Sequence, residues 1–119
     1  MRKITQESVS AFLDGTPFKK ANMEVQVSER HNIKFLMLHG HTIAIMENGK
    51  LRISNCGWQT NTTKERLNGL PDVHIQQKKG LWYLNGCYWN GNMISISILK
   101  DTNNKDMFNE SDLDTIFKS

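Results

Sequence analysis

The segment HTIAIMENGKLRIS, residues 41–54, carries the strongest local signal for the fold. Apolar and polar residues alternate on both sides of Asn48-Gly49, as in two strands joined by a tight turn. Both central positions of a type I′ turn need a positive φ, and Asn followed by Gly adopts it at the lowest cost. The segment therefore predicts a β-hairpin. The residues expected to share one face of this hairpin are Ile43, Ile45, Leu51 and Ile53.

Two strands are predicted before this hairpin. In MEVQV, residues 23–27, apolar and polar residues alternate, which is typical of a half-exposed antiparallel strand. In IKFLMLH, residues 33–39, apolar residues fall on both faces, which indicates a central strand. Together with the hairpin, these strands predict an antiparallel β-meander over residues 22–55.

Two short helices are expected, one on each side of the meander. The N-terminal sequence ITQESVSAFLDG, residues 4–15, fits a helix that is capped by Thr5. A helix this short is not stable alone, so it must pack on another element. In TTKERLNGLP, residues 62–71, Thr62 and Glu65 have the spacing of a capping box, which predicts the start of a second helix.

A second hairpin is predicted in VHIQQKKGLWYLNG, residues 73–86, with its turn at Lys79-Gly80. The last strand is expected in MISISIL, residues 93–99, where isoleucine and serine alternate. If this strand lies at a sheet edge, it can pair with a second copy of the chain, so it is a candidate site for forming a homodimer. The residues expected on one face of the second hairpin are Val73, Ile75, Leu81 and Tyr83.

These elements predict a single α+β domain over residues 1–119, built from the antiparallel meander, the second β-hairpin and short packed helices. Residues 1–100 form the compact body, with thirteen Lys and Arg against seven Asp and Glu, a net charge of +6. Residues 101–119 carry two against five, a net charge of −3. We expect an acidic loop and a short C-terminal helical turn there.

The sequence also bears on the compartment and on the classes of chemistry. No apolar run is long enough to cross a bilayer, and the basic N-terminus lacks the apolar segment of an export signal. We therefore expect a soluble protein that is not exported and binds no membrane, with Cys56 and Cys87 as reduced, half-buried thiols. Motifs for phosphate loops and activated nucleophiles are not found, so we expect no cofactor and no catalytic residue.

His39 and His41 are candidates for a metal site, and with it for a small metal-dependent enzyme. On a strand, residues two apart point the same way and can reach one ion. A zinc site normally has at least three protein ligands, and no other Cys or His has a matching spacing. The alternative is that Gly40 forms a tight bend and the two imidazoles flank it on the surface.

Aromatic and basic residues are concentrated in KKGLWYLNGCYWNGN, residues 78–92. Such a mixture suits a protein-binding patch, because Trp and Tyr dominate interface hot spots. It also suits a single-stranded nucleic-acid surface, where rings stack on bases and ammonium groups contact phosphates. The remaining alternative is that many of these rings form the core, and Trp58 can likewise pack at the end of the sheet. The candidate partner-binding residues are Lys78, Lys79, Trp82, Tyr88, Trp89 and Trp58.

The segment GWQTNTTKERLNGLP, residues 57–71, and the hairpin after it resemble small proteins of bacteriophages. The shared features are a tryptophan, a Thr-Thr helix start followed by Arg-Leu-Asn, and a downstream Lys-Gly-x-Trp segment, all within residues 39–91. The resemblance implies a small early-type phage product that acts in the cytoplasm of a bacterial host. Many such products, including anti-CRISPR and other anti-defence proteins, occupy the surface of a host machine and catalyse no reaction.

We therefore expect a non-catalytic, phage-type binding protein that inhibits or modulates a host macromolecular machine. Its expected partner is a host protein or a protein–nucleic-acid complex. Two alternatives stay open. One is direct binding of nucleic acid through the basic and aromatic surface, and the other is a small metal-dependent enzyme at His39 and His41.

Overall fold

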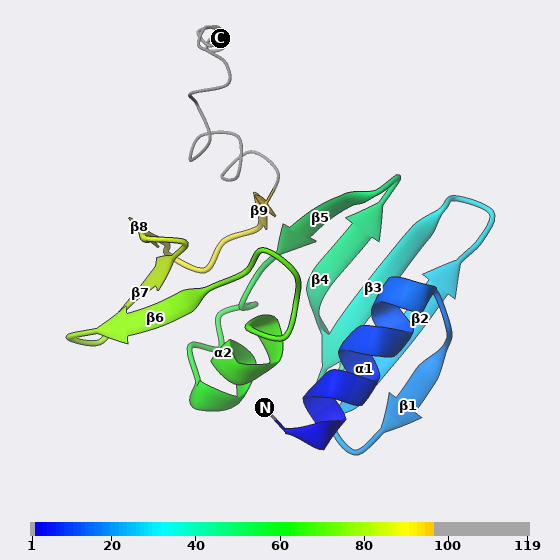
Figure 1. Ribbon diagram of the computed structural model, residues 1–119, viewed down its shortest axis with the longest axis horizontal. Helices are drawn as coiled ribbons and strands as arrows, with labels where there is room; N and C mark the ends of the chain where they lie inside the picture. Colours follow the sequence, from blue (N-terminus) through cyan, green and yellow to red (C-terminus); the bar gives the residue numbers. More distant parts are fainter. Residues whose placement is uncertain (1, 97–119) are drawn as a thin grey trace, which may run out of the picture.

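The computed structural model of the chain describes residues 2–96, which form two α-helices and nine strands (Figure 1). In chain order, the elements are α1 (Lys3–Asp14), β1 (Phe18–Lys20), β2 (Met23–Ser28), β3 (Ile33–Leu38), β4 (His41–Glu47), β5 (Lys50–Ile53), α2 (Asn61–Leu67), β6 (Ile75–Lys78), β7 (Leu81–Leu84), β8 (Cys87–Tyr88) and β9 (Ile94–Ser95).

The strands form two antiparallel sheets. The larger sheet has the order β1-β2-β3-β4-β5-β9, and the smaller sheet has the order β6-β7-β8. α1 packs on one face of β1, β2 and β3, and α2 lies beside it, near the smaller sheet (Figure 1). The α+β fold, the meander from β2 to β5 and the second hairpin are as predicted. The sequence pattern does not predict the short strands β1 and β8.

The turn at Asn48-Gly49 has the geometry that its sequence predicts. It joins Glu47 and Lys50, which pair across the hairpin. Its two residues have φ angles of 53° and 79°, both in the left-handed region that a type I′ turn requires. A positive φ at two successive residues, the second of which is glycine, also occurs at three other strand connections: His39-Gly40, Lys79-Gly80 and Asn85-Gly86.

β4 contains a β-bulge, which reverses the face of the sheet that the residues after it would otherwise occupy. The pairs on either side of the register shift are Leu36–Ala44 and Met37–Thr42. Ile43 is therefore an extra residue on β4, and it is buried together with its neighbour Ala44. The prediction that Ile45 shares a face with Ile43 is wrong, because the bulge shifts the alternation by one residue. The pairs across β4 and β5 are Ala44–Ile53, Ile45–Arg52 and Met46–Leu51.

The face predicted for the second hairpin also needs correction. Its two-residue turn makes Lys78 pair with Leu81, so Leu81 and Tyr83 lie on the opposite face from the buried Ile75. Val73 is buried as predicted, but Leu81 is 45% exposed. The core-facing residues of β7 are instead the alternate ones, Trp82 and Leu84.

Both helices begin two residues or more away from the expected caps. α1 starts at Lys3 after Arg2, which makes no side-chain capping bond, so Thr5 lies inside the helix and is fully buried. α2 is capped by Thr60, whose hydroxyl oxygen accepts from the Thr63 amide at 3.1 Å. The predicted capping box of Thr62 and Glu65 is therefore wrong.

Glu65 instead takes part in a polar network that joins the two helices. Its Oε1 accepts from the Thr5 hydroxyl at 2.5 Å, and its Oε2 accepts from the Arg2 amide at 3.2 Å. Arg66, which is only 2% exposed, donates to the same Glu65 oxygen, to Thr5 Oγ1 at 3.1 Å and to Asn22 Oδ1 at 3.3 Å. The network therefore connects α1, α2 and the β1–β2 turn.

The helices also approach closely at Gly69, just after α2. A Cβ placed on Gly69 would lie 2.7 Å from Cγ2 of Thr5, well inside van der Waals contact. Beneath this contact, one hydrophobic core spans both sheets, with residues as far apart as Phe12 and Ile96. The two sheets are thus parts of one packed unit within the described residues.

Three other expectations concern the termini and the thiols. Of the predicted strand 93–99, only Ile94–Ser95 forms a strand, which pairs with β5, and residues 97–99 lie outside the described residues. The expected acidic loop and helical turn at 101–119 also lie outside them. Cys56 and Cys87 are free and exposed, so the expectation of half-buried thiols is wrong.

We expect Thr5→Val to destabilise the protein, because it removes the hydroxyl that lies between Glu65 and the buried Arg66. The loss of its two hydrogen bonds to these charged groups should cost about 1–3 kcal/mol in the free energy of unfolding. Urea denaturation followed by circular dichroism measures this difference. Thr16→Val, at an exposed threonine, is the matched control and should change the value by less than about 0.5 kcal/mol.

The same network predicts a dependence on pH. Burial alone raises the pKa of Glu65, but hydrogen bonds from the Thr5 hydroxyl, the Arg2 amide and Arg66 outweigh it and hold the pKa below its ordinary value. A depressed pKa in the folded state stabilises the protein above about pH 4.3, the usual pKa of an unfolded Glu, and this contribution is lost as the pH falls through the folded value. Glu65→Gln should therefore be less stable near neutral pH and should lose less stability on acidification; equal losses would contradict the assignment.

Candidate partner-binding site

A pocket lies at the end of the larger sheet, where the β3–β4 turn meets the loop before α2. Its volume is about 260 Å³. Apolar side chains from the sheet form one part of its wall, and the threonines at the start of α2 form another. The residues that line it are Leu38, His39, His41, Ile43, Asn55, Trp58, Thr60, Thr62 and Thr63.

Trp58 forms the exposed rim of this pocket. Its side chain is 55% exposed, so it does not fill the end of the sheet. The indole ring lies against the imidazole of His41, with 5.7 Å between ring centroids and an interplanar angle of 38°. An aromatic ring that is both solvent-accessible and supported from one side can stack on, or pack against, a group supplied by another molecule.

Hydrogen bonds hold the loop that carries Trp58. The Trp58 amide donates to the Asn55 carbonyl at 2.8 Å, and the Thr60 amide donates to the Trp58 carbonyl at 2.9 Å. The side chain of Asn55 accepts from the Gly57 amide at 2.8 Å. The Cys56 thiol donates to the carbonyl of Thr42 on β4. These bonds fix the backbone on both sides of the indole.

The start of this loop is also tied to a distant part of the chain, at Gly91. The Gly91 carbonyl accepts from the Asn55 amide at 3.0 Å and from the Ser54 hydroxyl at 3.2 Å. Gly91 has a φ of 93°, and a Cβ on it would lie 2.1 Å from Nδ2 of Asn55. Only glycine therefore fits at this position without displacing the Asn55 side chain.

The two histidines also line the pocket. His39 is in the β3–β4 turn with a φ of 52°, and His41 is the first residue of β4; both are exposed. Their position on either side of Gly40 agrees with the tight bend considered for the sequence. Within residues 2–96, no group of three or more His, Cys, Asp or Glu side chains is placed to hold a metal ion.

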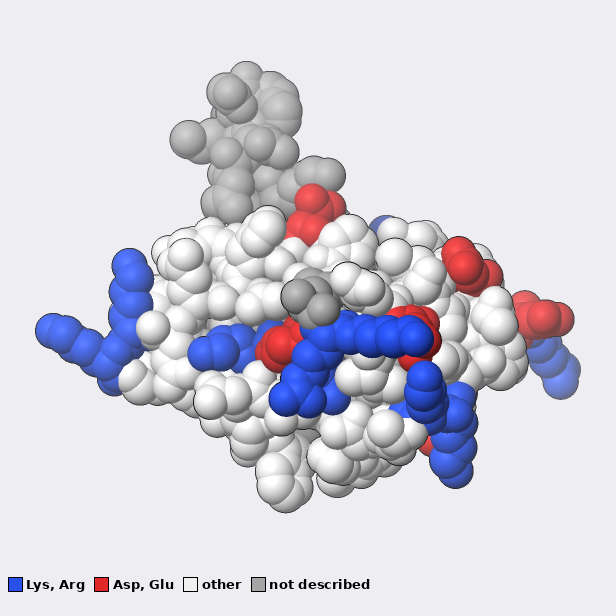
Figure 2. Space-filling view, turned by 60° about the horizontal axis from the view of Figure 1, so that its bottom comes forward, with Lys and Arg blue, Asp and Glu red and all other residues white. Residues whose placement is uncertain are grey.

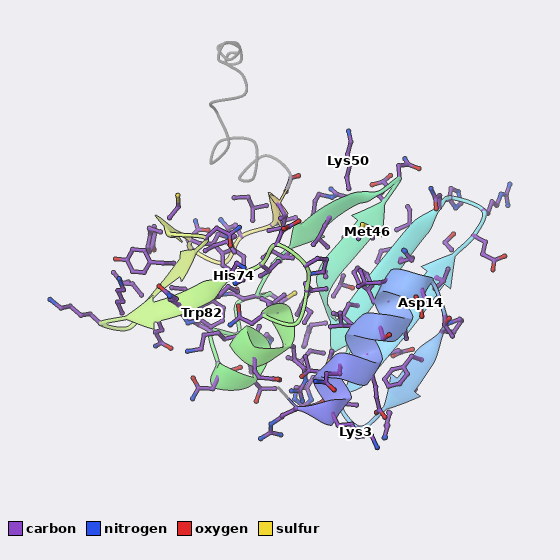
Figure 3. The ribbon with its side chains drawn as sticks, viewed as in Figure 1. Lys3, Asp14, Met46, Lys50, His74 and Trp82 are labelled. Atoms are coloured by element: carbon purple, nitrogen blue, oxygen red, sulfur yellow. The ribbon has the colours of Figure 1, made fainter. Side chains whose placement is uncertain are left out.

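Two of the predicted contact residues belong to the core. Trp82 is 2% exposed and Trp89 is 5% exposed, and their ring centroids lie 6.1 Å apart. The Trp89 indole nitrogen donates to the Asn92 carbonyl at 2.8 Å. Figure 3 shows Trp82 between the β6–β7 hairpin and α2. The structure therefore removes both rings from the accessible surface, as the core alternative predicts.

The other three hairpin residues, Lys78, Lys79 and Tyr88, are accessible. Lys79 is in the β6–β7 turn, whereas Lys78 pairs with Leu81 and lies on the same face of the smaller sheet as Tyr83. Tyr88 is 61% exposed, and its ring contacts Tyr83 edge-on at 6.2 Å on the outer face of the smaller sheet. α2 lies on the other face, because Lys64 donates to Gln77, which pairs with Trp82. The structure therefore separates Tyr88 from the Trp58 loop, which leads into α2.

The β6–β7 turn, with Lys78 and Lys79, adjoins the Trp58 loop. Gln59 Nε2 donates to the Gly80 carbonyl at 2.8 Å, which places the residue after Trp58 against this turn. Both lysines are exposed. In Figure 2, basic side chains project at the end of the molecule formed by this hairpin. The structure thus brings an exposed indole close to a basic turn.

Residues 1–113 match the family model of the Kyanoviridae Gp96 protein. The chain belongs to this family of bacteriophage proteins. The phage resemblance seen within residues 39–91 is therefore confirmed and extends over nearly the whole chain. No curated protein and no solved structure matches the chain significantly. In the described part of this Gp96-family protein, neither helix has the length and hydropathy needed to cross a membrane.

The pocket itself is not predicted by the sequence analysis, although its residues lie in the segment that decides the fold. The β4–β5 register pairs Ala44 with Ile53, so residues before 44 lie at the same end of the sheet as residues after 53. His41 and Trp58 meet for this reason. The register of the hairpin alone places His41 and Trp58 at the same end of the sheet, but the exposure of the indole depends on the geometry of its loop.

We expect Trp89→Ala to cost about 3–5 kcal/mol in the free energy of unfolding, because it leaves a cavity in the core beside Trp82. Its neighbour Tyr88 is the matched control: Tyr88→Ala should change stability by less than about 0.5 kcal/mol. Chemical denaturation of both variants measures the difference. Equal effects would contradict the assignment of Trp89 to the core and Tyr88 to the surface.

Proposed function

We propose that this Gp96-family protein is a non-catalytic binding protein that docks on a protein of the bacterial host, and thereby inhibits or modulates a host machine. An anti-defence role is one form of this activity. The observation that carries the proposal is Trp58, an indole that is 55% exposed on a loop held by hydrogen bonds. The proposed contact surface consists of the pocket beside Trp58 and the adjoining turn with Lys78 and Lys79.

The exposure of Trp58 supports this proposal on energetic grounds. Burial of a large apolar side chain contributes about 1.5–3 kcal/mol, so an exposed indole represents binding energy that the fold does not use. Tryptophan is also the residue type most enriched in interface hot spots. Because the loop is already ordered, little conformational entropy is lost when a partner covers it.

The pocket and the charges nearby indicate the chemistry of the partner. Leu38, Ile43 and Trp58 give the pocket an apolar lining, and Thr60, Thr62 and Thr63 also line it. A volume of about 260 Å³ suits one or two apolar side chains of a partner rather than a large cofactor. The lysines of the adjoining turn favour acidic groups beside these side chains.

Direct nucleic-acid binding is the rival reading of the same surface. A stacking platform uses several accessible rings beside basic groups. The burial of Trp82 and Trp89 takes two of the candidate rings away from such a platform. Trp58 and the two lysines alone are a better match to a protein contact, in which one aromatic anchor is surrounded by polar groups.

Affinity capture from a lysate of the bacterial host, with and without nuclease, tests the proposed function. The wild-type chain should retain one host protein after nuclease treatment. Trp58→Ala should lower the amount captured at least about tenfold, which corresponds to a loss of at least about 1.4 kcal/mol in binding. Its melting temperature should stay within a few degrees of the wild-type value, because the ring contributes little to the core.

Tyr88→Ala is the matched control, since Tyr88 is equally exposed but lies on the other face of the smaller sheet. It should retain the captured protein. Loss of capture on nuclease treatment would instead support direct nucleic-acid binding. Equal capture by the wild type and Trp58→Ala would overturn the assignment of the binding surface.

A further inference from the structure

The face of the larger sheet that points away from α1 carries a stripe of apolar side chains. They alternate along β3 and β4 with the buried residues that face the helix, and they belong neither to the core cluster nor to the side chains packed against it. In residues 2–96, both helices lie on the other side of the sheet (Figure 1). The residues of this stripe, all half-buried, are Ile33, Phe35, Met37 and Ile45.

The strand register places the two central residues of the stripe side by side. Phe35 on β3 pairs with Ile45 on β4. On one flank, Phe35 pairs with Gln26 of β2, and on the other, Ile45 pairs with Arg52 of β5. The row across the sheet is therefore polar, apolar, apolar and basic.

Polar side chains on each flank bind one another and leave the centre free of charge. On the β2 flank, Gln26 Nε2 donates to Glu24 Oε2 at 3.0 Å. On the β5 flank, Arg52 Nη2 forms an ion pair with Glu47 Oε1 at 2.9 Å, and Lys50 is the strand partner of Glu47 in the register across the turn. Lys19 adjoins Glu24, but it lies further out on β1. The β5 flank is thus net basic, and Glu24 is the acidic group nearest the stripe on the β2 flank.

We infer that this face is the interface of a homodimer, in which two copies of the chain pack their larger sheets face to face. A sheet with apolar residues on both faces requires a cover on each of them. α1 is the cover on one face, and a second copy presents a stripe of matching composition to the other. Two such sheets pack about 10 Å apart with their side chains interdigitating.

The charges on the flanks favour a second copy as the occupant. A two-fold axis parallel to the strands, midway between β3 and β4, brings the β2 flank of one copy over the β5 flank of the other. Phe35 then lies over Ile45 of the second copy. Gln26, which donates to Glu24, lies over Arg52 of the second copy, so Glu24 comes near that arginine. The contact is isologous, so both pairs occur twice. This arrangement differs from pairing through the edge strand β9.

The mass of the full chain in solution tests this inference. Sedimentation velocity should give twice the chain mass of 13.7 kDa for the wild type. Phe35→Glu should give a monomer with an unchanged circular dichroism spectrum, because the new charge points away from the core. Leu81→Glu, at an exposed leucine on the smaller sheet, is the control and should remain a dimer. If Phe35→Glu does not fold, Phe35→Gln serves for the same measurement.

A charge exchange tests the direction of the two-fold axis. Glu24→Lys and Arg52→Glu should each raise the dimer dissociation constant about tenfold, because each places like charges opposite one another. The double variant should restore the wild-type value, which only the proposed juxtaposition explains.

A wild-type chain that stays monomeric at its highest soluble concentration would overturn the homodimer, whether the C-terminal segment or a host protein covers the face instead. So would a Phe35→Glu variant that stays dimeric. Trp58→Ala should remain a dimer while losing its host partner. Failure of the dimer is therefore distinguishable from failure of the proposed function.

Discussion

The arrangement of the two helices depends on a buried guanidinium. Arg66 lies where α1, α2 and the β1–β2 turn meet, and it is 2% exposed. Removing such a charge from water is costly unless hydrogen bonds replace the hydration shell, and Thr5, Glu65 and Asn22 supply them. Because these partners come from three segments, Nη1 and Nη2 of the guanidinium have their partners only when all three segments are in place, whereas Nε has no hydrogen-bond partner within the described residues. The close approach at Gly69 adds a steric requirement for the same geometry.

Local sequence signals predict the larger part of the sheet, because their causes are local. A type I′ turn depends on two residues, and Asn48-Gly49 therefore predicts its hairpin well. The bulge at Ile43 depends on the neighbouring strand, and alternation alone cannot reveal it. The predicted helix caps are wrong for a related reason. Thr60 and Thr62 are equally suitable caps by residue type, and Glu65 accepts a hydrogen bond from Thr5, sixty residues away.

The candidate site shows the same division between local and long-range causes. The three tryptophans differ in exposure: Trp82 and Trp89 are buried, whereas Trp58 is exposed. The register of β7 turns Trp82 toward the core, and the Trp89 amide donates to the Trp82 carbonyl. The hydrogen-bonded loop leaves Trp58 exposed. The residue type alone does not show which face of the sheet each ring occupies. The two faces of the larger sheet illustrate this point again, because IKFLMLH predicts apolar residues on both of them without showing what covers each.

The bond between Gly91 and the start of the Trp58 loop limits how this protein can be divided. The loop follows the meander directly in the chain, yet its backbone is anchored by a carbonyl from the far end of the described residues. A fragment that ended just after this loop would carry the tryptophan but would lack this anchor. The proposed binding surface is therefore a property of the assembled domain, and a grafted loop or a shortened chain is a poor substitute for it.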